Sequence, residues 1–159
     1  MRNPEDKLKT PDGLRRILSR HRGARSKIVF TNGVFDLIHR GHISYLYRAR
    51  KLGSLLVVGV NADTSVKRLK GETRPINRLE DRLYQLAGLE CVDYVTSFSE
   101  DTPLKLIELL KPHTLIKGGD YAIRDIVGAS EVVGWGGTVK VLPFVDGYST
   151  TKIIQKFNH

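Results

Sequence analysis

The sequence is poor in cysteine and has no long apolar run. Its 159 residues include a single cysteine, Cys91, so no internal disulfide is possible. No stretch approaches the roughly 20 apolar residues that cross a bilayer, and residues 1–25 lack the apolar centre of a secretory signal. We therefore predict a cytoplasmic protein with no membrane partner.

Several common binding signatures are also missing. The sequence contains neither the Gly-x-Gly-x-x-Gly turn of dinucleotide-binding domains nor the Gly-x-x-x-x-Gly-Lys-[Ser/Thr] phosphate loop. This disfavours a nicotinamide-dependent oxidoreductase. The histidines are not grouped with cysteines, and no His-Glu-x-x-His pattern occurs, so we predict no metal held by protein side chains.

Positive charge is abundant, and the net charge is +9. Hydrophobic residues make up 40% of the chain, which is enough for one domain with a core of its own. Residues 1–25 hold eight Lys/Arg against three Asp/Glu, and we interpret them as a basic N-terminal extension that is mainly solvated surface. A second basic cluster spans residues 67–82 and is a candidate for binding phosphates. We expect residues 26–159 to form the single domain.

Short apolar runs alternate with segments of helical spacing, which predicts a doubly wound α/β domain with a parallel sheet. In such sheets, ligands bind beyond the carboxyl ends of the strands, where the strand order reverses. A final helix capped by Ser149 is expected to turn Ile153, Ile154 and Phe157 inward. The strands are expected at residues 27–30, 55–60, 93–97, 114–116 and 138–142, the last near a sheet edge, and helices at 43–52, 78–89 and after Pro103.

The segment after the first strand carries the strongest functional pattern, Thr-Asn-Gly-Val-Phe-Asp-Leu-Ile-His-Arg-Gly-His over residues 31–42. Asn32 and Gly33 are small enough for a ligand to approach the backbone. His39 and His42 stand three residues apart at a helix start, where both can face one phosphate and stabilise charge that grows on it. Helix capping and packing are the alternative for these histidines, and the pairing favours function.

Segments after the later strands supply further candidates. Asn61 and Asp63 can bind ribose hydroxyls or order the next turn. Lys67 and Lys70 are expected on a loop that closes over a triphosphate, with Lys70 preferred, and Arg74 follows them. For Arg82, surface pairing with Glu80 or Asp81 competes with a phosphate role.

Two more motifs complete the set. Lys-Gly-Gly-Asp-Tyr at residues 117–121 follows the fourth strand and is expected to face the first motif across the cleft. Ser-Thr-Thr at residues 149–151 opens the last helix, whose free N–H groups form an anion site. Asp36 has no firm role, and local capping is as plausible as any other.

Taken in order, these motifs resemble those of the nucleotidyltransferase superfamily that includes cytidylyltransferases and pantetheine-phosphate adenylyltransferase. The loop Lys-Arg-Leu-Lys-Gly, the Lys-Gly-Gly-Asp-Tyr segment and the Ser-Thr-Thr end are similar in particular to the adenylyltransferase domain of ADP-heptose synthase. The resemblance covers about residues 25–157. It implies a Rossmann-like nucleotidyltransferase fold and a nucleotidyltransferase domain at residues 26–159.

The resemblance also implies a reaction, adenylyl transfer from ATP to D-glycero-β-D-manno-heptose 1-phosphate, giving ADP-heptose and pyrophosphate for lipopolysaccharide inner-core synthesis. Mg²⁺ would arrive with ATP, a separate heptose kinase would supply the sugar phosphate, and the chain would form a homodimer. The predicted catalytic residues are His39, His42 and Lys70; the predicted nucleotide-binding residues are Thr31, Asn32, Gly33, Phe35, Asn61, Asp63, Arg74, Ser149, Thr150 and Thr151; and the predicted sugar-phosphate-binding residues are Lys117, Gly118, Gly119, Asp120 and Tyr121.

Two alternatives stay open from the residues alone. The same chemistry can serve a cytidylyltransferase that acts on another small phosphate such as glycerol 3-phosphate, because nothing in the motifs separates adenine from cytosine. The basic composition also permits a nucleic-acid-binding module. We predict no nucleic-acid partner, since the sequence lacks an aromatic RNA-binding platform and zinc-finger spacing.

Overall fold

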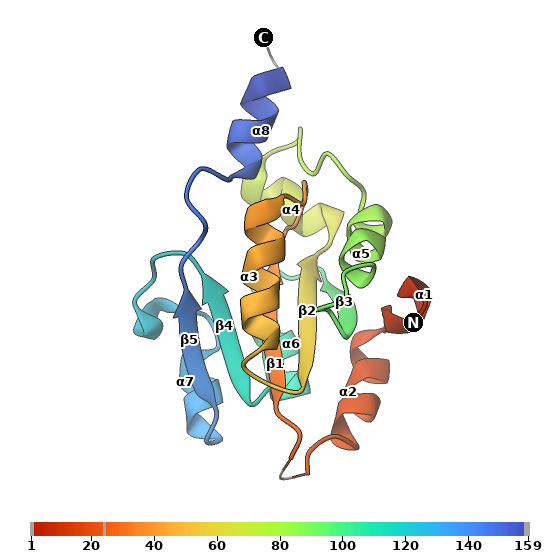
Figure 1. Cartoon of the computed structure of the whole chain (residues 1–159), viewed down its shortest axis with the longest axis vertical. Coiled ribbons are helices and arrows are strands. Elements are labelled where there is room, and N and C mark those ends of the chain that lie inside the picture. The colour runs from red at the N-terminus through yellow and green to blue at the C-terminus, as the bar shows by residue number, and fades with distance from the viewer. Residues whose placement is uncertain (1, 24, 158–159) are drawn as a thin grey trace.

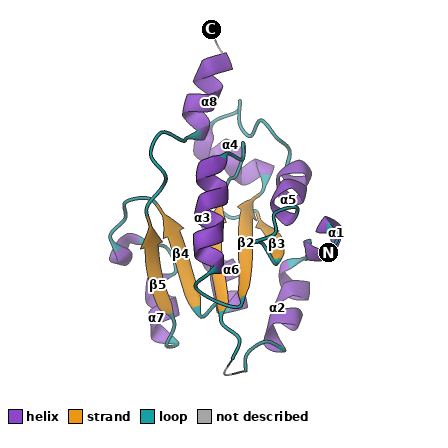
Figure 2. Cartoon of the chain, in the orientation of Figure 1, coloured by secondary structure: helices purple, strands orange, loops and turns teal. Residues whose placement is uncertain are grey.

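The computed structural model of the chain describes residues 2–23 and 25–157. Residues 1, 24, 158 and 159 lie outside the described residues, so the two predicted domain ranges are seen only in part. Five parallel strands stand at the centre, and helices cover both faces (Figures 1 and 2). The predicted α/β fold with a doubly wound parallel sheet is confirmed.

The strands follow the order β3-β2-β1-β4-β5, so the chain moves outward from β1 in one direction and then returns to its other side. The point where the order reverses therefore lies between β1 and β4, and β5 is an edge strand as expected. The strands are β1 (Ile28–Gly33), β2 (Leu55–Asn61), β3 (Tyr94–Phe98), β4 (Thr114–Gly118) and β5 (Thr138–Leu142).

Two apolar clusters hold the helices against the two faces. One cluster joins α3 and α5 to the sheet and includes Leu46 and Leu86, both fully buried. The other joins α2, α6 and α7 to the opposite face through residues such as Leu18 and Ile107. The helices are α1 (Pro4–Lys7), α2 (Pro11–Ser19), α3 (Arg40–Arg50), α4 (Asp63–Lys70), α5 (Leu79–Ala87), α6 (Leu104–Leu110), α7 (Ala129–Gly134) and α8 (Thr150–Phe157), with a short 3₁₀ helix η1 (Ile123–Asp125).

The basic segment at the N-terminus packs against the sheet. Thr10 caps α2 by accepting a hydrogen bond from the backbone N–H of Gly13. Leu14 and Leu18 of this helix are fully buried, and Leu8 forms a parallel bridge to Val95 beside the edge strand β3. The charged residues of α2 therefore lie on its outer face, and the apolar face of α2 is part of the core.

Three local expectations are wrong. The segment that carries the two lysines is not a loop, because α4 begins at Asp63 and has Lys70 as its last residue. Acidic Asp63 in its first turn and three basic residues in its last suit the helix dipole. Phe157 is 84% exposed rather than inward, and α8 contains no buried residue. Arg82 is completely buried instead of forming surface pairs.

Candidate active site

The sheet opens into a cleft at its switch point. β1 and β4 pair over only two positions, Val29 with Thr114 and Phe30 with Leu115, whereas β1 and β2 pair along six. Because pairing stops there, the ends of β1 and β4 diverge toward their carboxyl termini. Two adjoining cavities of about 370 Å³ and 180 Å³ fill this region.

The two cavities share a wall and differ in what they add to it. The larger cavity adds Lys70 and Asn61 from the β2 side. The smaller adds His42 from α3, together with aromatic Phe35 and Phe144. Predicted residues from three distant motifs thus meet in one cleft. The shared wall consists of Asn32, Gly33, Val34, Lys117 and Tyr121.

The two histidines stand at the start of α3. His39 occupies the N-cap position, yet its side chain makes no capping hydrogen bond. Its ring stacks on that of His42, with centroids 3.9 Å apart and planes at 20°. A Cβ atom added at Gly41 would lie 3.0 Å from the His39 ring, so glycine between the histidines allows this packing.

Both imidazoles are prepared as neutral groups. Burial, and the unfavourable interaction that two charged rings would have at His39 and His42, lower the pKa of His42 from 6.5 to about 4, although a hydrogen bond with the Leu37 backbone acts in the opposite direction. Burial also lowers the pKa of His39. The Nδ1 atoms of both rings are buried and have no hydrogen-bond partner among the described residues. Helix capping does not satisfy these two atoms, so each is a buried polar group that the packing of α3 leaves unexplained.

Two lysines bring positive charge to the cleft. Lys70 is exposed at the end of α4, while Lys67 pairs with Glu72 at 4.0 Å; this supports the preference for Lys70. Lys117 lies with its ammonium 5.5 Å from the ring centroid of Tyr121, and burial lowers its pKa. Lys70 and Lys117 approach the cleft from opposite sides of β1.

The start of α8 packs against the histidine motif. Ser149 caps the helix by accepting from the Lys152 backbone N–H at 3.1 Å, and the Thr150 hydroxyl donates to the Leu37 carbonyl at 3.4 Å. The Tyr148 ring stacks at 6.2 Å from that of His39. The expected anion site therefore lies beside the histidines, and the Thr151 side chain is exposed.

Three residues predicted to bind nucleotide make other contacts. Thr31 is fully buried and shares a 2.6 Å hydrogen bond with the Tyr45 hydroxyl beneath the cleft. Asn61 donates to Ser65 at 2.9 Å and so orders the first turn of α4, while still lining the larger cavity. The Asp63 Oδ1 accepts from Arg82 at 2.7 Å, so this residue has a structural partner, and its binding of nucleotide stays a prediction.

The predicted sugar-phosphate segment is divided. Lys117, Gly118 and Tyr121 line the cleft. Gly119 adopts a left-handed backbone with φ of 116°, which turns the chain so that Asp120 is exposed. Neither Gly119 nor Asp120 lines the two cavities among the described residues.

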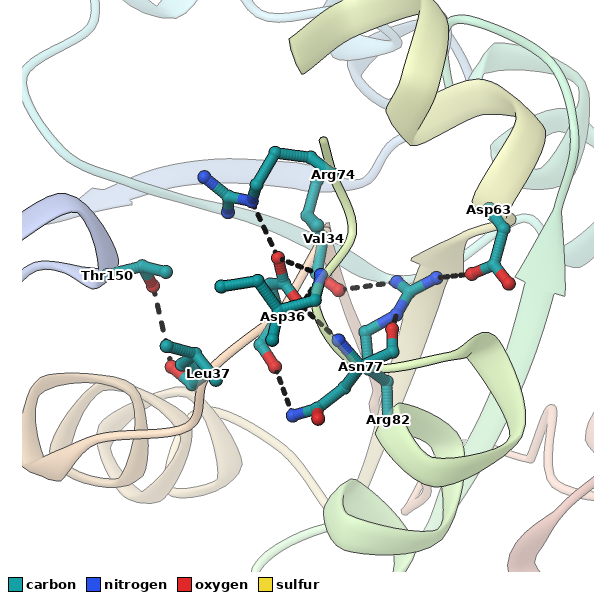
Figure 3. A network of polar contacts seen from close by, with 9 residues as sticks. Val34, Asp36, Leu37, Asp63, Arg74, Asn77, Arg82 and Thr150 are labelled. Carbon is teal, nitrogen blue, oxygen red and sulfur yellow. Dashed lines mark hydrogen bonds and ion pairs between the residues drawn. The ribbon is translucent and has the colours of Figure 1, made fainter. Parts of the chain in front are cut away.

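Sequence reasoning missed three residues that shape the site. Phe144, 54% exposed, forms a wall of the smaller cavity; no pattern marked it. Asp36 and Arg82 are buried at the centre of a polar network (Figure 3). An acid three residues after the strand-end glycine was the available signal for Asp36, but Arg82 lies in a run of charges typical of an exposed helix.

The fold, the switch-point cleft and the paired histidines define a class, and the chain belongs to the cytidylyltransferase-like family, whose model matches residues 30–156. Its curated relatives include the bifunctional protein HldE of Citrifermentans bemidjiense, 51% identical over 155 residues, which are 98% of this chain and 32% of that protein. The bifunctional protein HldE of a Marinomonas species is 61% identical over 132 residues, 83% of this chain and 28% of that protein. The chain thus spans about a third of these relatives.

Solved structures agree with this assignment. The lipopolysaccharide core biosynthesis protein of Thermoplasma volcanium is 33% identical with a TM-score of 0.61, and the match covers 78% of this chain and 99% of that one. Pantoate-β-alanine ligase of Francisella tularensis has a TM-score of 0.66 at 19% identity, covering 95% and 76% of the two chains; this likeness concerns the fold alone. No described helix is long and apolar enough to cross a membrane.

Proposed function

We propose that the chain transfers the adenylyl group of ATP to D-glycero-β-D-manno-heptose 1-phosphate, releasing pyrophosphate and forming ADP-heptose for the lipopolysaccharide inner core. The observation that carries this proposal is the cleft at the switch point, which is lined by His42 and two lysines, while His39 stacks on His42 and the segment that leads into α8 packs against His39. Each is a group that binds or stabilises phosphate oxygens.

In the proposed reaction, an oxygen of the sugar 1-phosphate attacks the α-phosphorus of ATP, and the bond to the β-phosphate oxygen breaks. The acceptor is already an anion at neutral pH, so no protein nucleophile is required. Catalysis then rests on positioning and charge stabilisation. His39, His42 and Lys70 contact the α-phosphoryl oxygens, while Arg74, Ser149 and Thr150 hold the leaving phosphates.

The substrate assignment has a separate basis. The relatives at 51–61% identity are named bifunctional protein HldE, and a structural relative is named for lipopolysaccharide core biosynthesis. The same motif set resembles the adenylyltransferase domain of ADP-heptose synthase. The two adjoining cavities offer polar partners for both substrates: Asn61 and Lys70 on the side predicted to bind the nucleotide, and Lys117 and Tyr121, on the side predicted to bind the sugar phosphate, in the wall that both cavities share.

The proposal also covers the metal ion, the source of the sugar phosphate and the oligomeric state. Mg²⁺ enters with ATP, because this ion keeps most of its water and phosphate ligands and needs few from protein. A sugar kinase activity supplies the heptose 1-phosphate, which the word bifunctional in the relatives' names supports. The homodimer stays a prediction, which sedimentation at several concentrations tests.

The first experiment incubates the protein with Mg²⁺ and heptose 1-phosphate, adds ATP, CTP, GTP or UTP in turn, and measures pyrophosphate. We expect release with ATP only, and only when the sugar phosphate is present. Release with CTP keeps the mechanism and refutes the adenylyl assignment; glycerol 3-phosphate is then the acceptor to test. No release with any nucleotide refutes the proposed reaction, and salt-dependent DNA binding then tests the remaining alternative.

A histidine variant tests the site. We expect His42→Ala to lower the turnover number about 10²–10³-fold with folding retained, the usual cost of one oxyanion-stabilising donor. His113→Ala is the matched control, because this histidine is also partly buried but lies where β1 begins and accepts from the Ile28 N–H at 3.0 Å. An unchanged turnover number for His42→Ala would sink the catalytic assignment.

A further inference from the structure

Asp36 is a buried carboxylate with an unusual set of partners. It lies three residues after the end of β1 and is 2% exposed. Its oxygens accept from the backbone N–H groups of Ile76 and Asn77, each at 2.9 Å, and from the Arg74 Nε at 2.7 Å. The Asn77 side-chain amide donates to the Asp36 carbonyl at 2.8 Å. One residue therefore fastens the segment 74–77 to the histidine motif (Figure 3).

These bonds keep Asp36 ionised. Burial alone would raise the pKa of its carboxyl, but the N–H groups of Asn77 and Ile76 and the Arg74 guanidinium outweigh burial and lower it. A carboxylate in this state binds its donors more strongly than a neutral acceptor does. The anchor is therefore charged at neutral pH.

Arg74 is held by one edge only. Its side chain is 19% exposed, and Asp36 occupies its Nε. Within the described residues, no hydrogen bond joins its two terminal nitrogens to the protein. In Figure 3 these nitrogens point away from Asp36 and carry no dashed line, on the side of the network where Thr150 lies.

A second buried charge secures the same segment from behind. Arg82 donates to the Asn77 carbonyl at 3.0 Å, to the Val34 carbonyl at 2.7 Å and to Asp63 at 2.7 Å. The segment 74–77 is thus fixed both to the loop after β1 and to the start of α4. Freedom that Arg74 would have on an exposed loop is removed before any ligand binds.

We propose that Asp36 is a positioning residue that presents the terminal nitrogens of Arg74 to the β- and γ-phosphates of the nucleotide. This inference rests on the proposed function, in which Arg74 holds the leaving phosphates. Asp36 touches no substrate itself. Its contribution is the fixed direction of a guanidinium, whose planar fork binds phosphate only when it is correctly oriented.

The test begins with Asp36→Asn, which keeps the shape of the side chain and removes its charge. We expect kcat/KM for MgATP to fall about 10- to 100-fold, the range of one charge-assisted hydrogen bond. We expect the KM for heptose 1-phosphate to stay within about twofold, the accuracy of such measurements. A merely structural role would not separate the two substrates in this way.

Asp93→Asn is the matched control. Asp93 also accepts from an arginine Nε, that of Arg50 at 2.9 Å, and from a backbone N–H, that of Leu56 at 2.8 Å. It precedes β3, at the opposite end of the sheet from the cleft. We expect this variant to lose stability as Asp36→Asn does, with both KM values and kcat unchanged.

A double variant decides whether Asp36 acts through Arg74. We expect Arg74→Ala to lower kcat/KM for MgATP as much as Asp36→Asn, and the double variant to be no worse than Arg74→Ala alone. Losses that multiply would overturn the proposal. So would equal effects on both substrates, or an Asp36→Asn enzyme that matches wild type.

Binding separates this proposal from the reaction assignment. Calorimetry with MgATP alone measures the same Asp36–Arg74 dependence without any acceptor. A wild-type protein that binds MgATP and releases no pyrophosphate refutes the proposed reaction, while a weaker affinity in both variants still supports positioning. Failure of the wild type to bind MgATP overturns both.

Discussion

Arg82 provides the sharpest test of the buried network. The substitution Arg82→Met fills much of the same volume and removes three donated hydrogen bonds, to the carbonyls of Val34 and Asn77 and to Asp63. The arginine is completely buried, and its partner Asp63 is 39% exposed. Water therefore replaces the donor at Asp63 in part, while the two carbonyls lose theirs.

The expected loss follows from these contacts. An unsatisfied buried polar group costs about 1–3 kcal/mol, and removing one partner of a buried pair costs about 3–5 kcal/mol. Since Asp63 is partly hydrated, we expect a loss of about 3–4 kcal/mol in the free energy of unfolding. For a chain of this length, that lowers the melting temperature by roughly 6–16 °C.

Urea unfolding followed by circular dichroism measures this free energy. Arg68→Met is the matched control, because Arg68 donates from its Nε to Asp101 at the same 2.7 Å, but both side chains are at least half exposed, at 50% and 62%. Such an exposed pair contributes below about 1 kcal/mol. If Arg82→Met is as mild as Arg68→Met, the reasoning about burial is refuted.

Two further predictions concern the histidine motif. Gly41→Ala places a Cβ 3.0 Å from the His39 ring and 3.1 Å from the Tyr148 Cβ, so we expect a turnover number about tenfold lower. We expect the free energy of unfolding to stay unchanged or to rise, because alanine favours the helix. A variant as active as wild type would contradict the packing argument. Acid is expected to destabilise the protein between pH 6.5 and 4, where the unfolded state binds a proton at His42 and the native state does not. Below this window stability falls further, because the unfolded chain protonates the Asp36 carboxyl at a higher pH than the native state, in which its pKa is lowered. Urea midpoints across this range measure the slope, and a His42→Ala slope equal to that of wild type would refute the assignment.

The positions of the strands along the chain and the edge of the sheet that holds the cleft could be predicted because each depends on a local pattern. The continuous apolar run at residues 55–60 predicts a strand covered on both faces, and the structure has β2 there with six of its seven residues buried, from Leu56 to Asn61. Ser149 caps α8 as expected. Residues just beyond strand ends then meet at one edge of a parallel sheet, whatever the details of packing.

The remainder depends on partners that are distant in sequence. Arg82 lies on a helix between Glu80 and Tyr84, in a sequence pattern typical of an exposed helix. This pattern gives no sign of Asp63, the partner 19 residues away to which Arg82 donates. Asp36 meets its donors 38 to 41 residues downstream. The inward position expected for Phe157 is wrong for a different reason. Helical spacing predicts that Ile153, Ile154 and Phe157 share one face of α8, but it does not predict that another element covers that face.

The groups proposed to bind phosphate differ in how strongly the rest of the fold fixes their positions. Arg74 is fixed through the buried Asp36, whereas α8, which has no buried residue, meets the histidine motif through the 3.4 Å contact of Thr150 and the ring of Tyr148. A triphosphate that contacts both Arg74 and the start of α8 would bring α8 toward the fixed guanidinium of Arg74. Part of its binding free energy is then used to order that helix. We infer that a nucleotide lacking the outer phosphates leaves α8 loosely held, and that the leaving group itself helps to assemble the site.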